Sequence, residues 1–300
     1  MKVLKGLALS LLGILLFLSL SLFGIAFTLN STVLNPDFTV AELDRLDISS
    51  VAGELISDQL AEQLPAEMAF IDQAVIDNIV ADMEPWIKEQ AGTAVRISYD
   101  YLLGKSENLS LAITTGPVLE TLKSHLWAAL SASPPPEFAN LPPAVLEQQF
   151  NQLFTELARE IPATFEVDES LIPLDVMAQL VQARQYINYF QTGYKALIGL
   201  AALLIIGFIL IHREVKGTTR GLGIIFLTYG AIEYGGILAA RHLALPQLPL
   251  AEIPPSVQIW LPQFINNLAR PLEILSIGCM AAGAVLLVAS FVYKRSRASS

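Results

Sequence analysis

The chain has 300 residues, of which 53% are hydrophobic and 15% charged, and its mean hydropathy is +0.53, which excludes an ordinary water-soluble protein and indicates an integral membrane protein. One cysteine, Cys279, excludes an intramolecular disulfide, and only three histidines accompany it, so we expect no metal site and no cofactor. The net charge of −10 argues against a nucleic-acid partner.

The first apolar segment covers residues 7–29, which are 23 consecutive uncharged positions. As a helix this segment is about 34 Å long, enough to cross a hydrocarbon core of about 30 Å. We therefore assign residues 1–29 to an N-terminal transmembrane helix. Because Lys2 and Lys5 precede the segment, a cleaved signal peptide is the alternative. The length of the segment and the lack of a clear cleavage site favour an uncleaved anchor.

Residues 30–193 form an acidic region that we expect to fold as a separate helical domain. They hold 24 of the 28 acidic residues and seven basic residues. Apolar residues recur at helical spacing in residues 51–64, 76–87 and 146–161. Residues 109–113 and 164–167 alternate instead between apolar and polar or small side chains, so we expect them to pair as a small two-stranded ribbon.

Three further apolar runs lie in residues 194–300, at 196–211, 222–240 and 272–293. The fold is therefore expected to be mainly α, with four transmembrane helices, a short cytoplasmic loop and a second outer loop at 241–271. Basic residues flank the spans on one side, which by the positive-inside rule makes both termini cytoplasmic and residues 30–193 extracytoplasmic. These flanking residues are Lys2, Lys5, Arg213, Lys216, Arg220, Lys294, Arg295 and Arg297.

Glu233 lies near the middle of the third span, where a carboxylate is costly and often functional. One interpretation is a proton or cation site. The other is a glutamate that hydrogen-bonds Tyr229, Tyr234 or a backbone carbonyl and only fixes packing. Near the outer end of the fourth span, Arg270 and Glu273 are spaced to form an i, i+3 pair.

Small residues in spans three and four predict close packing of these two helices. The residues concerned are Gly221, Gly223, Gly230, Gly235 and Gly236 in span three and Gly278, Ala282 and Gly283 in span four. The second outer loop contains an amphipathic helical pattern that Pro262 is expected to interrupt. Its apolar positions are Val257, Trp260, Leu261, Phe264, Ile265 and Leu268. This helix lies either on the outer membrane surface or against the acidic domain, and the sequence does not separate these two placements.

Three short motifs carry a resemblance, and they are Asn35-Pro36-Asp37-Phe38, Leu43-Asp44-Arg45-Leu46-Asp47 and Tyr101-Leu102-Leu103-Gly104. Together they resemble a group of uncharacterised prokaryotic four-span membrane proteins with a large helical extracytoplasmic domain. The resemblance covers about residues 1 to 130. It implies a bacterial or archaeal plasma-membrane protein and transfers no activity and no site residue.

No motif for nucleophilic, zinc or nucleotide chemistry is present in the sequence, so we expect a protein that is not an enzyme. The leading hypothesis is a membrane protein whose outer domain binds a protein partner, an envelope component or a second copy of the chain. In this hypothesis the helix bundle in the lipid bilayer is the anchor and relay. The alternative is an ion or proton channel or transporter centred on Glu233, as a homo-oligomer if one copy is too thin for a pore.

Overall fold

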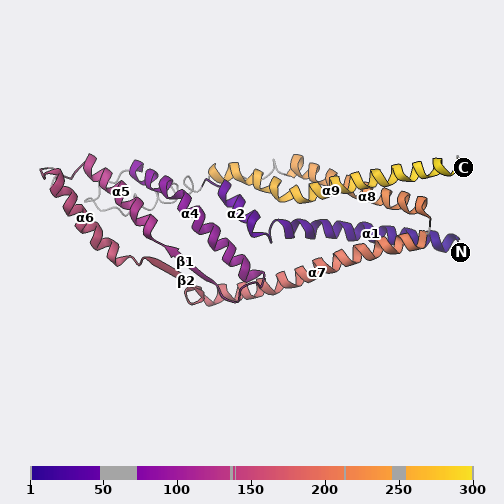
Figure 1. The fold of residues 1–300 in the computed structure, drawn as a ribbon, viewed down its shortest axis with the longest axis horizontal. Helices are drawn as coiled ribbons and strands as arrows, with labels where there is room; N and C mark the ends of the chain where they lie inside the picture. The colour runs from indigo at the N-terminus through magenta and orange to yellow at the C-terminus, as the bar shows by residue number, and fades with distance from the viewer. Residues whose placement is uncertain are drawn as a thin grey trace. The chain divides into compact units, whose positions relative to one another are not determined.

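The structure, a computed structural model, describes residues 2–47, 73–135, 138, 140–212, 214–244 and 255–298. These residues form eight α-helices and one two-stranded antiparallel sheet (Figure 1). The predicted mainly α fold is therefore confirmed, together with its four long apolar helices and its small ribbon. The predicted helical stripe at residues 51–64 lies outside the described residues.

The chain divides into two compact units. Unit 1 contains Met1–Thr39, Ala183–Glu252 and Leu261–Ser300, and unit 2 contains Val40–Gln182 and Ile253–Trp260. The middle part of the predicted second outer loop, Ile253–Trp260, thus belongs to the same unit as most of the acidic region, and the rest of the loop belongs to unit 1.

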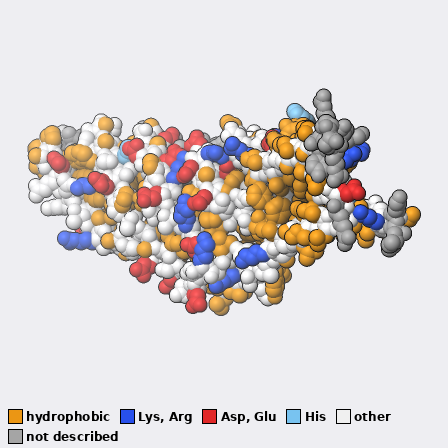
Figure 2. Space-filling view, turned by 45° about the vertical axis from the view of Figure 1, so that its right-hand side comes forward, with side chains coloured by type: hydrophobic (Ala, Val, Ile, Leu, Met, Phe, Trp, Pro, Cys, Tyr) orange, Lys and Arg blue, Asp and Glu red, His pale blue; other side chains and the backbone are white. Residues whose placement is uncertain are grey.

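Unit 1 is built on four helices, α1 (Lys2–Ser31), α7 (Leu174–His212), α8 (Val215–Ala239) and α9 (Pro255–Ala298). Each contains a window long and apolar enough to cross a membrane, which indicates a multi-pass membrane protein. Figure 2 shows hydrophobic side chains covering much of the surface of these helices. Because a bilayer solvates apolar side chains, such a surface is stable within a membrane.

Helices α1 and α7 pack antiparallel. At one end the Lys5 ammonium group donates to the carbonyl of His212 at 3.2 Å, where it faces the negative end of the α7 dipole. Towards the other end, the rings of Phe23 and Tyr194 stack with their centroids 5.8 Å apart. The N-terminal end of α1 and the C-terminal end of α9 lie on the same side of the bundle (Figure 1).

Unit 2 contains three amphipathic helices in addition to most of α2 (Pro36–Arg45). These are α4 (Gln73–Leu102), α5 (Gly116–Ala132) and α6 (Pro143–Glu160). Helix α4 ends in a turn at Gly104, whose φ of 73° is a conformation that side chains other than glycine rarely adopt.

The core of unit 2 is a layer in which α5 lies between α4 and α6. Its buried residues are Ile76, Val80, Tyr101, Ala129, Leu130, Leu146 and Phe154. The rings of Trp127 and Phe150 join α5 to α6 at a centroid distance of 5.4 Å. On the other side of α5, a ring nitrogen of His125 hydrogen-bonds the Asp82 carboxylate of α4 at 2.7 Å.

The ribbon pairs β1 (Ser110–Thr114) with β2 (Thr164–Asp168) in antiparallel register, with Leu111 opposite Val167. At the end of β2, the hydroxyl and the backbone N–H of Ser170 donate to the Asp168 carboxylate at 2.5 and 2.9 Å. These two hydrogen bonds stabilise the charged carboxylate and hold the pKa of Asp168 below its ordinary value. They fix the chain where it leaves the ribbon.

Candidate functional site

Glu233 lies on α8 in unit 1 and is half-buried. Among the described residues, no side chain or backbone group hydrogen-bonds or ion-pairs with it. Successive residues of an α-helix are rotated by about 100° around its axis. In the rotation from Tyr229 to Gly230 around α8, Glu233 therefore lies between the two, about 40° from Tyr229 and about 60° from Gly230. Tyr229 faces α1 and Gly230 faces α9. The Glu233 position therefore points between α1 and α9.

Tyr229 is fully buried where α1, α8 and α9 meet. Its ring packs edge-on against Phe17 of α1 at a centroid distance of 6.1 Å. A Cβ atom added to Gly24 of α1 would lie 2.4 Å from the Tyr229 hydroxyl and 2.9 Å from the Leu272 side chain of α9. Within the described part of the chain, the Tyr229 hydroxyl has no hydrogen-bond partner. We call Gly24, Tyr229, Gly230, Glu233 and Ser276 the three-helix junction.

Gly230 allows the backbones of α8 and α9 to touch. A Cβ atom at this position would lie 2.4 Å from the Ser276 carbonyl oxygen. A second close contact lies further along, where a Cβ atom on Gly283 would lie 2.8 Å from the Gly223 carbonyl oxygen. The Ser276 hydroxyl donates a hydrogen bond to the Leu272 carbonyl at 2.7 Å.

The other small residues predicted for packing lie elsewhere on the two helices. A Cβ atom added to Gly235, Gly236 or Gly278 meets nothing within 4 Å, and Ala282 is exposed. Of the predicted small residues, Gly223, Gly230 and Gly283 lie in the contact, because the side on which α8 and α9 meet is a property of tertiary packing. Tyr234 is half-buried, and it makes no hydrogen bond to any described residue.

An ion pair joins the end of α8 to α9. Arg241 lies in the π-helical turn η3 (Ala240–Ala244), and its guanidinium donates to the Glu273 carboxylate at 2.6 Å. The predicted partner of Glu273 was Arg270, which is exposed. Arg241 replaces it because antiparallel packing brings η3 to the level of Glu273. Because the charge of Arg241 is neutralised in this pair, Arg241 does not neutralise Glu233.

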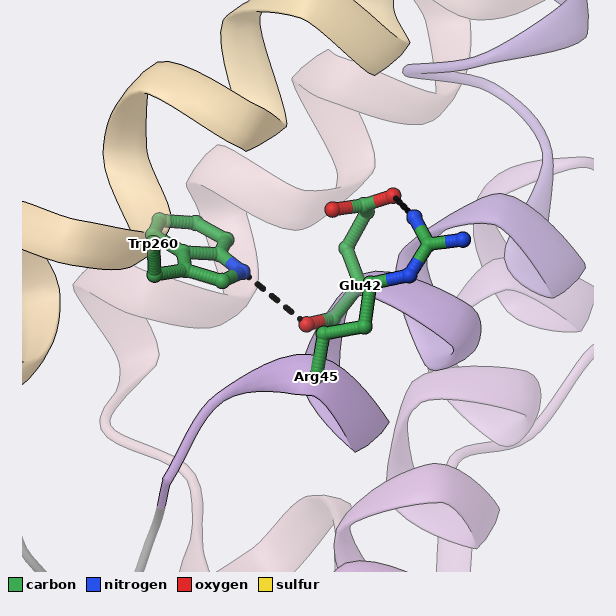
Figure 3. Close-up of polar contacts among 3 residues, drawn as sticks. All are labelled: Glu42, Arg45 and Trp260. Atoms are coloured by element: carbon green, nitrogen blue, oxygen red, sulfur yellow. Dashed lines mark hydrogen bonds and ion pairs between the residues drawn. The ribbon is translucent and has the colours of Figure 1, made fainter.

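A polar cluster in unit 2 holds the start of α9 against α2 (Figure 3). The indole N–H of Trp260 donates to the backbone carbonyl of Glu42 at 3.1 Å. The Glu42 side chain is only 4% exposed, and its carboxylate forms an ion pair with Arg45. From α4, the Lys88 ammonium group donates to the Asp44 carbonyl at 2.9 Å. Helix α2 is thus held from two sides.

The predicted amphipathic helix is the first part of α9, which continues through Pro262 and Pro271 to Ala298. The expected interruption at Pro262 is therefore absent. Phe264 packs on Phe38 at a centroid distance of 6.1 Å, and Trp260 contacts Glu42 as described. Val257, Leu261, Ile265 and Leu268 are half-buried. The Trp260 contact supports the placement of this segment against the acidic domain.

Helix α6 packs on one side only. Leu146 and Phe154 are buried, whereas Leu153 and Leu157, which belong to the same predicted stripe, are 63% and 51% exposed. Val145, near the start of α6, is 39% exposed and lies about 80° around the helix from Leu153. Hydropathy spacing predicted the helix and could not tell which apolar side chains of the stripe would be buried.

The described residues contain no group of three or more histidine, cysteine or acidic side chains that could hold a metal ion. No protein-family model, curated protein or solved structure matches the chain.

We predict that Gly24→Ala destabilises the bundle by about 1–3 kcal/mol, because the added methyl group overlaps the Tyr229 hydroxyl. Adding Tyr229→Phe should recover part of this loss. Thermal unfolding of the detergent-solubilised protein, followed by circular dichroism, measures both effects. Gly235→Ala is the matched control and should not lower the unfolding midpoint. Equal losses for the two alanine variants would contradict the close contact at Gly24.

Trp260→Phe keeps an aromatic ring and removes the donor to the Glu42 carbonyl. We expect a loss of about 0.5–1.5 kcal/mol in the free energy of unfolding, the usual net contribution of one hydrogen bond. Trp86→Phe is the control, because the buried Trp86 indole N–H has no partner among the described residues. Chemical unfolding of the purified protein compares the two. A smaller effect for Trp260→Phe than for Trp86→Phe would count against the contact.

Proposed function

We propose that this protein is a non-enzymatic plasma-membrane protein of a prokaryote, in which unit 2 binds a protein partner outside the cytoplasm. The four long helices are its anchor and its relay. The observation that carries the proposal is the exposed pair Leu153 and Leu157, one turn apart on α6, with Val145 also exposed near the start of the helix. Large apolar side chains aligned on one helix outside the membrane-spanning segments are typical of a binding surface.

The charged side chains around Leu153 and Leu157 suggest the chemistry of the partner. Glu147, Glu156 and Glu160 are exposed on α6, with Arg159 as the only basic residue of the helix. An amphipathic helix binds by laying its apolar side chains into a groove of the partner. The partner that fits α6 is therefore a protein with an apolar groove and a basic rim. An acidic rim would be repelled by the carboxylates.

The proposed orientation has both termini in the cytoplasm and residues 30–193 outside it. Lys5 contacts the carbonyl of His212 at one end of the bundle, and Lys216 and Arg220 follow in the first turns of α8. Cations that gather at one end of a set of spans favour the cytoplasmic side for that end. The resemblance to prokaryotic four-span proteins supports the same plan.

The binding proposal predicts that Leu153→Gln combined with Leu157→Gln abolishes capture of a partner by in-cell crosslinking, because the apolar contact is lost. Thermal stability should be nearly unchanged, since both side chains are already exposed. Capture is measured by affinity purification and mass spectrometry. The control is Gln148→Ala with Gln152→Ala on the same helix, which should keep the partner. A partner retained by the leucine variant would remove α6 from the binding surface.

The orientation proposal predicts which positions a membrane-impermeant maleimide reaches in intact cells. In a Cys279→Ser background, Gln152→Cys should be labelled, and Lys216→Cys should be labelled only after the cells are opened. Mass shift on gels reads out both reactions. Labelling of Lys216→Cys in intact cells would reverse the proposed topology.

A further inference from the structure

The three-helix junction contains two oxygen groups that nothing else in the described residues satisfies. The Tyr229 hydroxyl is fully buried and without a partner, and Glu233 follows it by one turn of α8. Buried polar groups in proteins are nearly always hydrogen-bonded to protein or to bound water and ions. Within a membrane this requirement is stricter, because lipid supplies neither donors nor acceptors.

Near the junction, the described residues carry one more negative charge than positive charges. Arg241 and Glu273 neutralise each other through their 2.6 Å ion pair. The other titratable side chains there are Tyr229, Tyr234 and Cys279 of α9, which packs against the core around Tyr229, and none of them is a cation. Glu233 is thus the one carboxylate near the junction that no described cation neutralises. A monovalent cation would cancel its charge, whereas a divalent cation would leave an uncompensated positive charge in a medium of low dielectric constant.

We propose that Glu233 and Tyr229 form an intramembrane binding site for one sodium ion. The carboxylate supplies the charge, and the tyrosine hydroxyl supplies a second oxygen. Both are hard oxygen ligands, which hard cations prefer. The close helix contacts at Gly24 and Gly230 leave the Tyr229 ring little room to move, so its hydroxyl is held in place. A bound cation is also what the transport interpretation of Glu233 requires.

This site lies on unit 1 and does not depend on α6, so its test is independent of the binding proposal above. The full-length wild-type protein in liposomes is treated with dicyclohexylcarbodiimide, which modifies protonated carboxyl groups in apolar surroundings. Mass spectrometry of the digested protein gives the labelling rate at Glu233. We expect this carboxyl group to react, and Glu273, held by Arg241, to react far less.

Two salts test the cation. If sodium binds, sodium chloride slows labelling of Glu233 at constant pH, and the same concentration of choline chloride does not. Labelling at the same rate in sodium chloride and in choline chloride would overturn the proposal, and so would a Glu233 that stays unlabelled in the absence of sodium.

Tyr229→Phe tests the second ligand without removing the labelled group. Loss of one ligand should weaken the protection by sodium by about tenfold in sodium concentration. Tyr234→Phe is the matched control on the neighbouring position and should behave as the wild type. If both variants behave as the wild type, Tyr229 is not a ligand. The labelling measured on the wild type requires no variant to fold.

Discussion

The close approach of α1, α8 and α9 is the steric constraint on which the membrane-spanning unit depends. In a membrane, helices gain little from burying apolar surface against each other, because lipid is equally apolar, so van der Waals contact between backbones carries much of the association. Gly24 admits the Tyr229 side chain, and Gly230 admits the backbone of α9 at Ser276. A methyl group at either position would separate the helices.

This packing also decides which charges meet. The antiparallel pairing of α8 and α9 brings Arg241 onto Glu273, whereas Glu233 is half-buried without a described partner. On insertion scales an acidic side chain at the centre of a span costs about 2.5–3.5 kcal/mol. An ionisable side chain within a membrane is often functional for this reason.

Unit 2 solves a different packing problem. Each of its helices has one apolar stripe. Helix α5 contacts α4 on one side and α6 on the other. Helix α6 lies at the end of this layer, and Leu153 and Leu157 of its stripe remain exposed. The Trp260 contact adds the first turns of α9 to the same unit. The proposed partner surface and the proposed cation site are therefore on separate units of one chain.

The sequence by itself determined the four apolar spans, the helical character of residues 76–87 and 146–161 and the two segments of the ribbon, because these depend on hydropathy and its period along the chain. Tertiary structure alone decided that Glu273 pairs with Arg241 and not Arg270, that Gly223 and Gly283 pack while Gly235 and Gly278 do not, and that α9 continues through Pro262. Periodicity places a residue on a face of its own helix. Which neighbour covers that face depends on the direction and rotation of a second helix, and local sequence does not encode either one.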